Sequence, residues 1–345
     1  MSLKKYFSRA AFMGCLLLLM MIQTPIAGSA DVDPRLEPLE GKIVRLIVST
    51  KPGGGYDTYA RVAVQYMKKY LPECTIIIKN IPGAGHIIGT NEIYRSKPNG
   101  LTFGMGNHKG LLFAQLAGQK GIRFDLAKMS WLANVAGETQ VLILRKALPY
   151  KTITDVKKAT TQLRMGASGV GSSSYNFTLM VRHIMGINFK LNPGYSGSEA
   201  DIAMMRGELD GQVGAWDNLR AVVESGEAKV VLMIGTKRLP QFPDIPMMKD
   251  FTTPQNQGLI NLMHAMVDLG RPVAAPPGMQ PDLLQALRGV VEKTFKDPDL
   301  LAHAKRIKIP IDYTSGEETR KMFVEALDQP PEVVNLVKEM AKPVQ

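Results

Sequence analysis

Short runs of β-branched residues alternate with amphipathic segments from Lys42 to Gly235, and this alternation constrains the fold more than any other feature. The runs cover 44–50, 75–80, 102–107 and 140–146, and then 164–169, 189–194, 211–216 and 229–235. Strands that alternate with helices favour α/β units with parallel strands. The two series therefore predict an α/β protein with two lobes, which suits a chain of 345 residues.

Apolar side chains at helical spacing predict several helices that pack on these sheets. The faces are Tyr59, Ala63, Tyr66, Met67, Tyr70 and Leu71; Phe177, Met180, Val181, Ile184 and Met185; Ile202, Met205 and Leu209; and Leu284, Leu287, Val291 and Phe295 after Pro281. Four prolines between 236 and 258 predict an irregular but ordered loop.

The first 30 residues have the pattern of a cleaved secretory signal peptide. Lys4, Lys5 and Arg9 precede an apolar stretch that is too short to span a bilayer, and small residues follow it. The mature chain is expected to begin near Asp31 and to be periplasmic. Its formal charge falls from +11 to +8, and Cys74 is its only cysteine, so no intramolecular disulfide can form. The positive charge is dispersed, which argues against nucleic acid as a partner.

A glycine turn at 53–55 connects the first predicted strand to a helix, with Asp57 placed as the expected N-cap. A helix N-terminus presents unpaired N–H groups to an anion, and glycine leaves room for the anion to approach. Taken alone, such a junction is more often a simple tight turn.

Similar junctions recur after other predicted strands, at 80–86, 166–175, 193–201 and 215–226. The segment 166–175 offers several serines beside a helix start, and Ser196 and Glu199 have the spacing of a capping box. The carboxyl ends of strands line the ligand crevice of an open α/β sheet. This recurrence predicts a cleft that binds anions through backbone and hydroxyl donors.

Catalytic patterns are weak in comparison. The sequence has no dinucleotide fingerprint, Walker lysine or HExxH motif, and Ser172 to Ser174 lack a nucleophile elbow. A serine hydrolase would need a base such as His183, for which a surface position is the better interpretation. Lys109 is similarly expected to be a solvated lysine.

Four segments identify the family that this chain resembles. KPGGGYDTYAR, IIIKNIPGAGHIIGTNEIYRSKPNGLTFG, MGASGVGSSSYNFTLM and TKRLPQFPDIP are similar to the extracytoplasmic solute receptors of tripartite tricarboxylate transporters, also called the Bug family. The resemblance runs in order across nearly the whole mature chain.

The resemblance implies a type II periplasmic binding protein, in which two α/β lobes close on a ligand. The first lobe would comprise 31–141 and 269–345, and the second 142–268. Members bind a di- or tricarboxylate, an amino acid or an aromatic acid, and deliver it to a membrane permease. The implied protein is a monomeric receptor without a cofactor and is not an enzyme. A sensor that docks on a membrane kinase is the alternative.

The resemblance also implies which residues contact the ligand. In the first lobe these are Gly54, Gly55, Asp57, Pro82, Gly83, Ala84 and Gly85. In the second lobe they are Ser168, Gly169, Ser172, Ser173, Tyr195, Ser196 and Asp217, of which Asp217 is expected either to orient the binding loop or to accept from a ligand hydroxyl or amine.

The chain departs from the family pattern at two places. Gly106 to Lys109 replace small polar residues of many relatives, so His108 and Lys109 could recognise a second carboxylate or simply face water. Trp216, where relatives carry another apolar residue, could stack on an aromatic acid or pack beneath the cleft.

Overall fold

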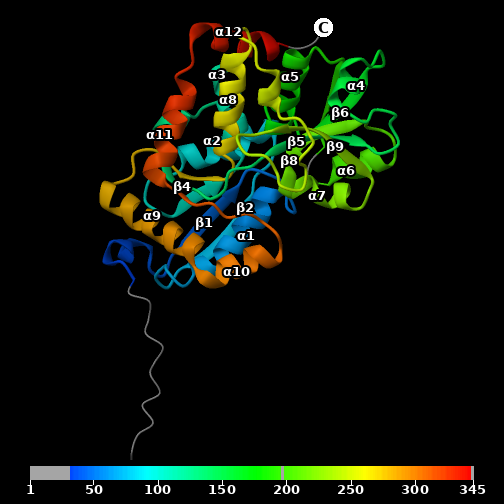
Figure 1. Cartoon of the computed structure of the whole chain (residues 1–345). Helices are drawn as coiled ribbons and strands as arrows, with labels where there is room; N and C mark the ends of the chain where they lie inside the picture. Colours follow the sequence, from blue (N-terminus) through cyan, green and yellow to red (C-terminus); the bar gives the residue numbers. More distant parts are fainter. Residues whose placement is uncertain (1–31, 196–197, 343–345) are drawn as a thin grey trace, which may run out of the picture.

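A computed structural model describes residues 32–195 and 198–342. The predicted signal peptide and Ser196 lie outside this range. Two sheets organise the fold, and we call the elements built on each the first and second lobes (Figure 1). Across these described residues, no helix combines the length and apolar character needed to cross a bilayer.

The first sheet has the strand order β11-β4-β10-β3-β1-β2. β1 pairs in parallel with β2 and β3, whereas β10 runs antiparallel to β3 and β4, and β11 antiparallel to β4. The strands are β1 (Ile43–Val48), β2 (Thr75–Asn80), β3 (Thr102–Met105), β4 (Ser130–Asn134), β10 (Pro272–Ala275) and β11 (Thr314–Ser315).

The second sheet has the order β7-β6-β8-β5-β9. β6 pairs in parallel with β7 and β8, and β5 runs antiparallel to β8 and β9. The strands are β5 (Gln140–Arg145), β6 (Leu163–Ala167), β7 (Phe189–Pro193), β8 (Gly211–Ala215) and β9 (Ala228–Ile234). The chain crosses between the sheets from β4 to β5 and returns from β9 to β10. The predicted boundary at 141/142 falls inside β5, and the exact lobe limits stay a prediction.

Helices cover both sheets. In the first lobe they include η1 (Pro34–Leu39), α1 (Gly55–Met67), η2 (Ala84–His86), α2 (Ile87–Arg95), α3 (His108–Leu116), η3 (Leu126–Lys128), α9 (Pro281–Lys296), α10 (Pro298–Arg306), α11 (Gly316–Leu327) and α12 (Pro331–Met340). Between β5 and β10 they are α4 (Ile153–Lys157), α5 (Ser173–Met185), α6 (Glu199–Met205), α7 (Trp216–Glu224), η4 (Met248–Phe251) and α8 (Gln257–Asp268).

The eight predicted strands are confirmed, but the expectation of parallel pairing holds only for the pairs that β1 and β6 make. The predicted faces of α5 and α9 point inward, with Phe177 and Phe295 buried. The expected inward face of α6 is wrong, because Ile202 and Met205 are 46% and 59% exposed. This short helix is buried instead through Ala200, Ala203 and Met204, and the two alanines are small enough to allow close approach of the helix.

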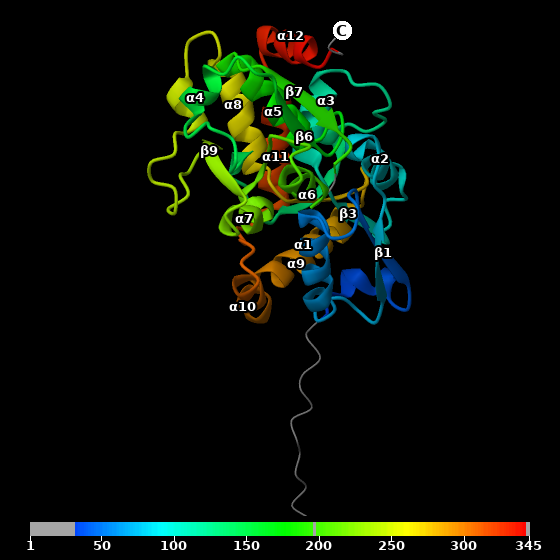
Figure 2. The ribbon, with the colours of Figure 1, turned by 90° about the vertical axis from the view of Figure 1, so that its right-hand side faces the viewer.

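One hydrophobic core is shared by the two lobes. Buried side chains of α3 and α5 belong to the same cluster as those of α8, α11 and α12, among them Leu111, Phe177, Met263, Phe323 and Val337. Figures 1 and 2 both show α12 lying above this helical layer. The C-terminal helix therefore contacts the second lobe as well as the first, since it packs against both α3 and α5.

Asp297 is the N-cap of α10, and its carboxylate also hydrogen-bonds to Lys69 and Tyr70, which follow α1. Its Oδ1 accepts from the N–H groups of Asp299 and Leu300 at 2.8 and 3.2 Å, and its Oδ2 accepts from Lys69 and the Tyr70 hydroxyl at 3.0 and 2.6 Å. Burial opposes ionisation of this carboxyl, but the hydrogen bonds from Tyr70 and Lys69 lower its pKa below the usual value.

Asp297→Ala is expected to lower the free energy of unfolding by about 1 to 2 kcal/mol at pH 7, because it removes an N-cap and a buried acceptor. Because the pKa of Asp297 is lower in the folded protein than in the unfolded chain, the ionised carboxylate stabilises the fold. This stabilisation is fully present above the unfolded pKa of about 3.9 and is lost as the pH falls through the folded pKa. Urea unfolding should therefore show a smaller difference in unfolding free energy between the wild type and Asp297→Ala at pH 3 than at pH 7. Asp299→Ala, at a carboxylate that is 75% exposed, is the control and should cost less than about 0.5 kcal/mol. An equal loss at both pH values would contradict the charge-dependent role.

Candidate ligand-binding site

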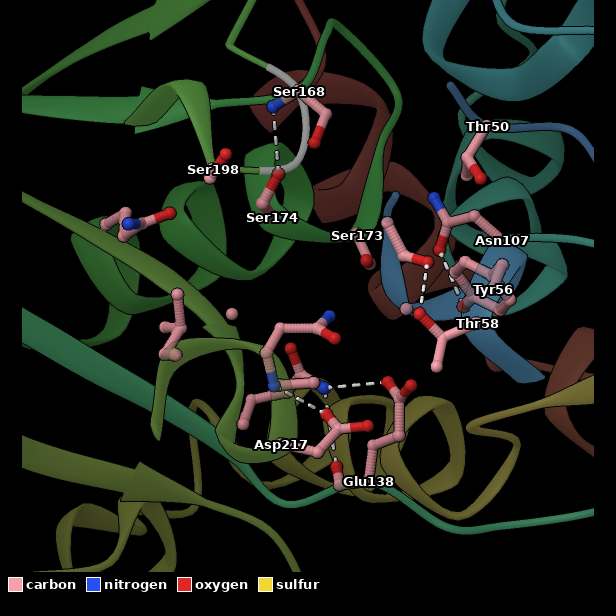
Figure 3. A pocket seen from close by; sticks show the side chains of 18 of the residues that line it. Thr50, Tyr56, Thr58, Asn107, Glu138, Ser168, Ser173, Ser174, Ser198 and Asp217 are labelled. Atoms are coloured by element: carbon pink, nitrogen blue, oxygen red, sulfur yellow. Dashed lines mark hydrogen bonds between the residues drawn. The ribbon is translucent and has the colours of Figure 1, made fainter. Parts of the chain in front are cut away.

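A cavity of about 360 Å³ lies between the two lobes. Figure 3 shows Thr50, Tyr56 and Asn107 on one side, Ser168, Ser174 and Ser198 on another, and Glu138 close to Asp217. Of the predicted contact residues, those that line the cavity are Gly54, Gly55, Ser168, Ser173, Tyr195 and Asp217. The predicted residues Asp57, Pro82, Gly83, Ala84, Gly85, Gly169 and Ser172 lie outside its lining.

The glycine turn at 53–55 brings the start of α1 to the cavity. Gly54 is the N-cap residue and Gly55 begins the helix, so the prediction that Asp57 is the N-cap is wrong. Asp57 lies in the first turn of the helix, where its Oδ2 accepts from the Gly53 N–H at 2.9 Å and from Arg61 Nε at 2.8 Å. Burial opposes ionisation, but these bonds together lower the pKa of Asp57. Asp57 thus stabilises the glycine turn through the Gly53 N–H without lining the cavity.

Gly55 is closely surrounded by residues from both lobes. A Cβ atom built there would lie 2.7 and 2.8 Å from Arg271 Nη2 and Nη1, and would collide with Asn218 Oδ1. No side chain fits at this position without displacing those groups. The absence of a Cβ is therefore needed for packing as well as for access to the helix N-terminus.

The loop at 82–86 contacts the second lobe directly. A Cβ atom on Gly85 would collide with the Val170 carbonyl and lie 3.2 Å from Ser172 N. Gly169 lies next to Gly85, and Gln119 Nε2 donates to the Val170 carbonyl at 3.5 Å. The two loops therefore contact each other. Of the residues at 82–86, His86 is the one that lines the cavity. Ligand contacts from 82–85 stay a prediction.

The serine segment starts α5 and divides its roles among neighbouring residues. Ser172 is buried and caps the helix, accepting from the Tyr175 N–H at 3.3 Å. Ser174 Oγ accepts from the Ser168 N–H at 3.1 Å (Figure 3). Ser173 lines the cavity. Among the described residues neither Ser172 nor Ser173 hydrogen-bonds to a histidine, and His183 is exposed, so no catalytic triad is assembled here.

Two further predictions concern the second lobe. The expected capping box at 196–199 involves Ser196, which lies outside the described residues; Glu199 is the first residue of α6 and Ser198 its N-cap. Trp216 packs edge-on against Phe242, with ring centroids 4.9 Å apart, and is not part of the lining. Of the two alternatives for Trp216, packing within the protein is therefore the one observed.

A buried network of four charged side chains lies beside the cavity, and no sequence pattern predicted it. Arg271 Nη2 donates to Asp217 Oδ2 at 2.8 Å, Arg271 Nε contacts Glu138 Oε1, and Lys109 Nζ contacts Glu138 Oε2. The guanidinium lies 4.6 and 4.8 Å from the ring centroids of Tyr56 and Tyr59. Two positive and two negative charges balance, as burial requires.

This network corrects the prediction for His108 and Lys109. Lys109 is 1% exposed and not solvated, and burial together with the nearby positive charge of Arg271 lowers its pKa well below the usual value, an effect that the negative charge of Asp217 opposes. His108 is buried with its ring edge-on to Trp131, and burial lowers its pKa to about 3. Neither lines the cavity. Helix α3 begins at His108 and turns both side chains inward, and sequence spacing cannot show this.

Asn107 and His86 supply polar groups that sequence reasoning missed. Asn107 lines the cavity and is buried, and its Nδ2 has no hydrogen-bond partner among the described residues. His86 Nδ1 lies 2.9 Å from the Ser49 carbonyl, which can only accept, so Nδ1 carries the proton and Nε2 is an acceptor. Asn107 follows β3, so the rule that strand ends line the crevice could have identified it.

The charged residues of the lining are mostly paired. Lys51 Nζ lies 3.0 Å from Glu199 Oε1 across the rim, and Arg271 is engaged by Asp217 and Glu138. A ligand carboxylate would therefore meet neutral donors: the N-terminal ends of α1 and α5, serine and threonine hydroxyls, and Asn107. In the part of the chain that the structure describes, no three His, Cys, Asp or Glu side chains are arranged to hold a metal ion.

Comparison with known structures gives the same fold. The periplasmic binding protein BugD superposes with a TM-score of 0.71 at 20% identity, covering 87% of this chain and 98% of BugD. MatC of Rhodopseudomonas palustris with bound malate gives 0.68 at 20% identity, covering 88% and 99%. An R. palustris protein with adipate gives 0.70 at 18%, covering 87% and 97%. These likenesses confirm the predicted fold, that of a two-lobed periplasmic binding protein.

Comparison of sequences identifies the family. A UPF0065 protein of Bordetella pertussis is 28% identical over 206 residues, which cover 59% of this chain and 63% of the relative. The profile of the tripartite tricarboxylate transporter family receptors matches residues 59–338. That match spans most of the chain, including all of the second sheet and every strand of the first sheet except β1. The chain therefore belongs to the tripartite tricarboxylate transporter receptor family.

Proposed function

We propose that this protein captures a small carboxylate in the periplasm and delivers it to the membrane permease of a tripartite transporter. The observation that carries the proposal is the cavity, which is lined by the starts of α1 and α5 from opposite lobes and by Asn107 Nδ2 and Thr50 Oγ1, neither of which has a hydrogen-bond partner among the described residues. Helix N-termini and hydroxyl groups stabilise a carboxylate without a countercharge. Residues 1–30 act as the export signal, and the mature protein works as a monomer.

The proposed ligand class follows from relatives and from the cavity together. MatC was solved with malate and a second R. palustris protein with adipate, and both ligands are small carboxylates. A cavity of about 360 Å³ suits a molecule of this size. The predicted contacts that line the cavity, from Gly54 to Asp217, would surround it.

A thermal-shift screen of the mature protein against aliphatic and aromatic carboxylates tests the proposal. A ligand present at 100 times its Kd stabilises the native state by about 2.7 kcal/mol, which should raise the melting temperature by several degrees. Neutral sugars and simple cations serve as the control panel. The proposal fails if members of that panel raise the melting temperature and no carboxylate does.

A further inference from the structure

Asp201 is a carboxyl group in the cavity that has no cationic partner within the part of the chain that the structure describes. It lies on α6, lines the cavity and is half-buried. Gln212 Nε2 donates to its Oδ1 at 2.6 Å, which fixes the orientation of the group. Its Oδ2 has no hydrogen-bond partner among residues 32–195 and 198–342. Burial raises the pKa of Asp201, and the hydrogen bond from the neutral Gln212 amide offsets this only in part.

The other charged groups of the lining cannot supply that partner. Lys51 is paired with Glu199 at the rim, and Arg271 lies between Asp217 and Glu138. His86 is buried, and burial lowers its pKa, so it stays neutral at physiological pH. Among the described residues of the lining, Asp201 is thus the carboxyl whose charge no described cation balances.

We propose that Asp201 selects a ligand that carries an ammonium group in addition to its carboxylate, that is, an amino acid. This inference rests on the proposed function, because it assumes that the cavity binds a carboxylate. An ammonium group would donate charge-assisted hydrogen bonds to the open Oδ2. A second ligand carboxylate at the same place would be repelled by a like charge in a partly buried site.

Matched ligands that differ only in this group provide the test. Isothermal titration would compare succinate with β-alanine, glutarate with 4-aminobutyrate, and adipate with 5-aminopentanoate, together with a panel of α-amino acids and the monocarboxylates of the same length. The wild-type protein is expected to bind at least one amino acid about tenfold or more tightly than the matched mono- or dicarboxylate.

The variant Asp201→Asn keeps the shape and removes the charge. It should lose that preference and bind the amino acid about tenfold or more weakly, while Glu208→Gln, at an exposed carboxylate outside the lining, should bind as the wild type does. Equal or tighter binding of the dicarboxylates by the wild type would overturn this inference and leave the proposed function intact. Failure of every carboxylate, aminated or not, to bind would reject the proposed function itself. The ligand series on the wild type decides the question even if Asp201→Asn does not fold.

Discussion

Gly55→Val is expected to weaken carboxylate binding by at least about a hundredfold and to lower the free energy of unfolding by about 1 to 3 kcal/mol. The side chain would cover the N-terminus of α1, which presents N–H donors to the cavity. It would also push on the guanidinium of Arg271 and on Asn218 of the second lobe. Both effects act on the face where the ligand would bind, so binding should suffer more than stability.

Titration of the best ligand from the thermal-shift screen, together with urea unfolding, checks this expectation. Gly289→Val is a suitable control, since Gly289 lies on α9 and a Cβ atom there would meet nothing within 4 Å. It should bind ligand normally. A folded Gly55→Val protein with unchanged affinity would refute a ligand role for the turn.

Arg271→Met is expected to cost about 3 to 5 kcal/mol of unfolding free energy, the largest loss from a single substitution that the structure suggests. Arg271 is 1% exposed and touches the carboxylates of both Asp217 and Glu138. Asp217 makes no other ion pair among the described residues, so removal of the guanidinium leaves a buried charge unbalanced. Because Asp217 and Glu138 border the cavity, ligand affinity should fall as well.

Urea unfolding of four variants, Arg271→Met, Asp217→Asn, their double variant and Arg95→Met, separates this effect from the loss of any arginine. Arg95→Met removes a guanidinium that is 70% exposed and paired with Glu92, and it should cost less than about 1 kcal/mol. The double variant Arg271→Met with Asp217→Asn should be more stable than the sum of the single losses predicts, because it removes the unpaired charge. A loss below about 1 kcal/mol for Arg271→Met would show that the network contributes little.

Local features of the sequence predicted the elements well where a strand or helix follows its own periodic pattern. The β-branched run at 75–80 matches β2 residue for residue, and Pro281 begins α9 as predicted. The prediction for α6 was wrong because the helical spacing of Ile202 and Met205 places them on one face of the helix but does not show whether that face is buried. Periodicity identifies a helix, but the packing of the helix against the neighbouring strands determines which of its faces is buried.

The sequence also located part of the cavity wall. Glycine and serine turns after strands were predicted to converge, and Gly55, Ser168 and Ser173 do line one cavity. Asp57 and Ser172, chosen by the same reasoning, lie outside the lining and hydrogen-bond to the backbone of their own turns. A residue beside an anion-binding turn can face the ligand or the turn, and its type alone does not distinguish the two.

The sequence by itself determined the α/β class, the position of most strands and the turns where donors gather, because these depend on short-range periodicity and on backbone freedom at glycine. Only the tertiary structure decided the chemistry of the cavity. It brings Lys109, Glu138 and Arg271 into one buried network, and it places no cation of the described chain in an ion pair with Asp201. Charge pairing inside a protein depends on distances between residues far apart in the chain, and those distances are set by how the two sheets pack.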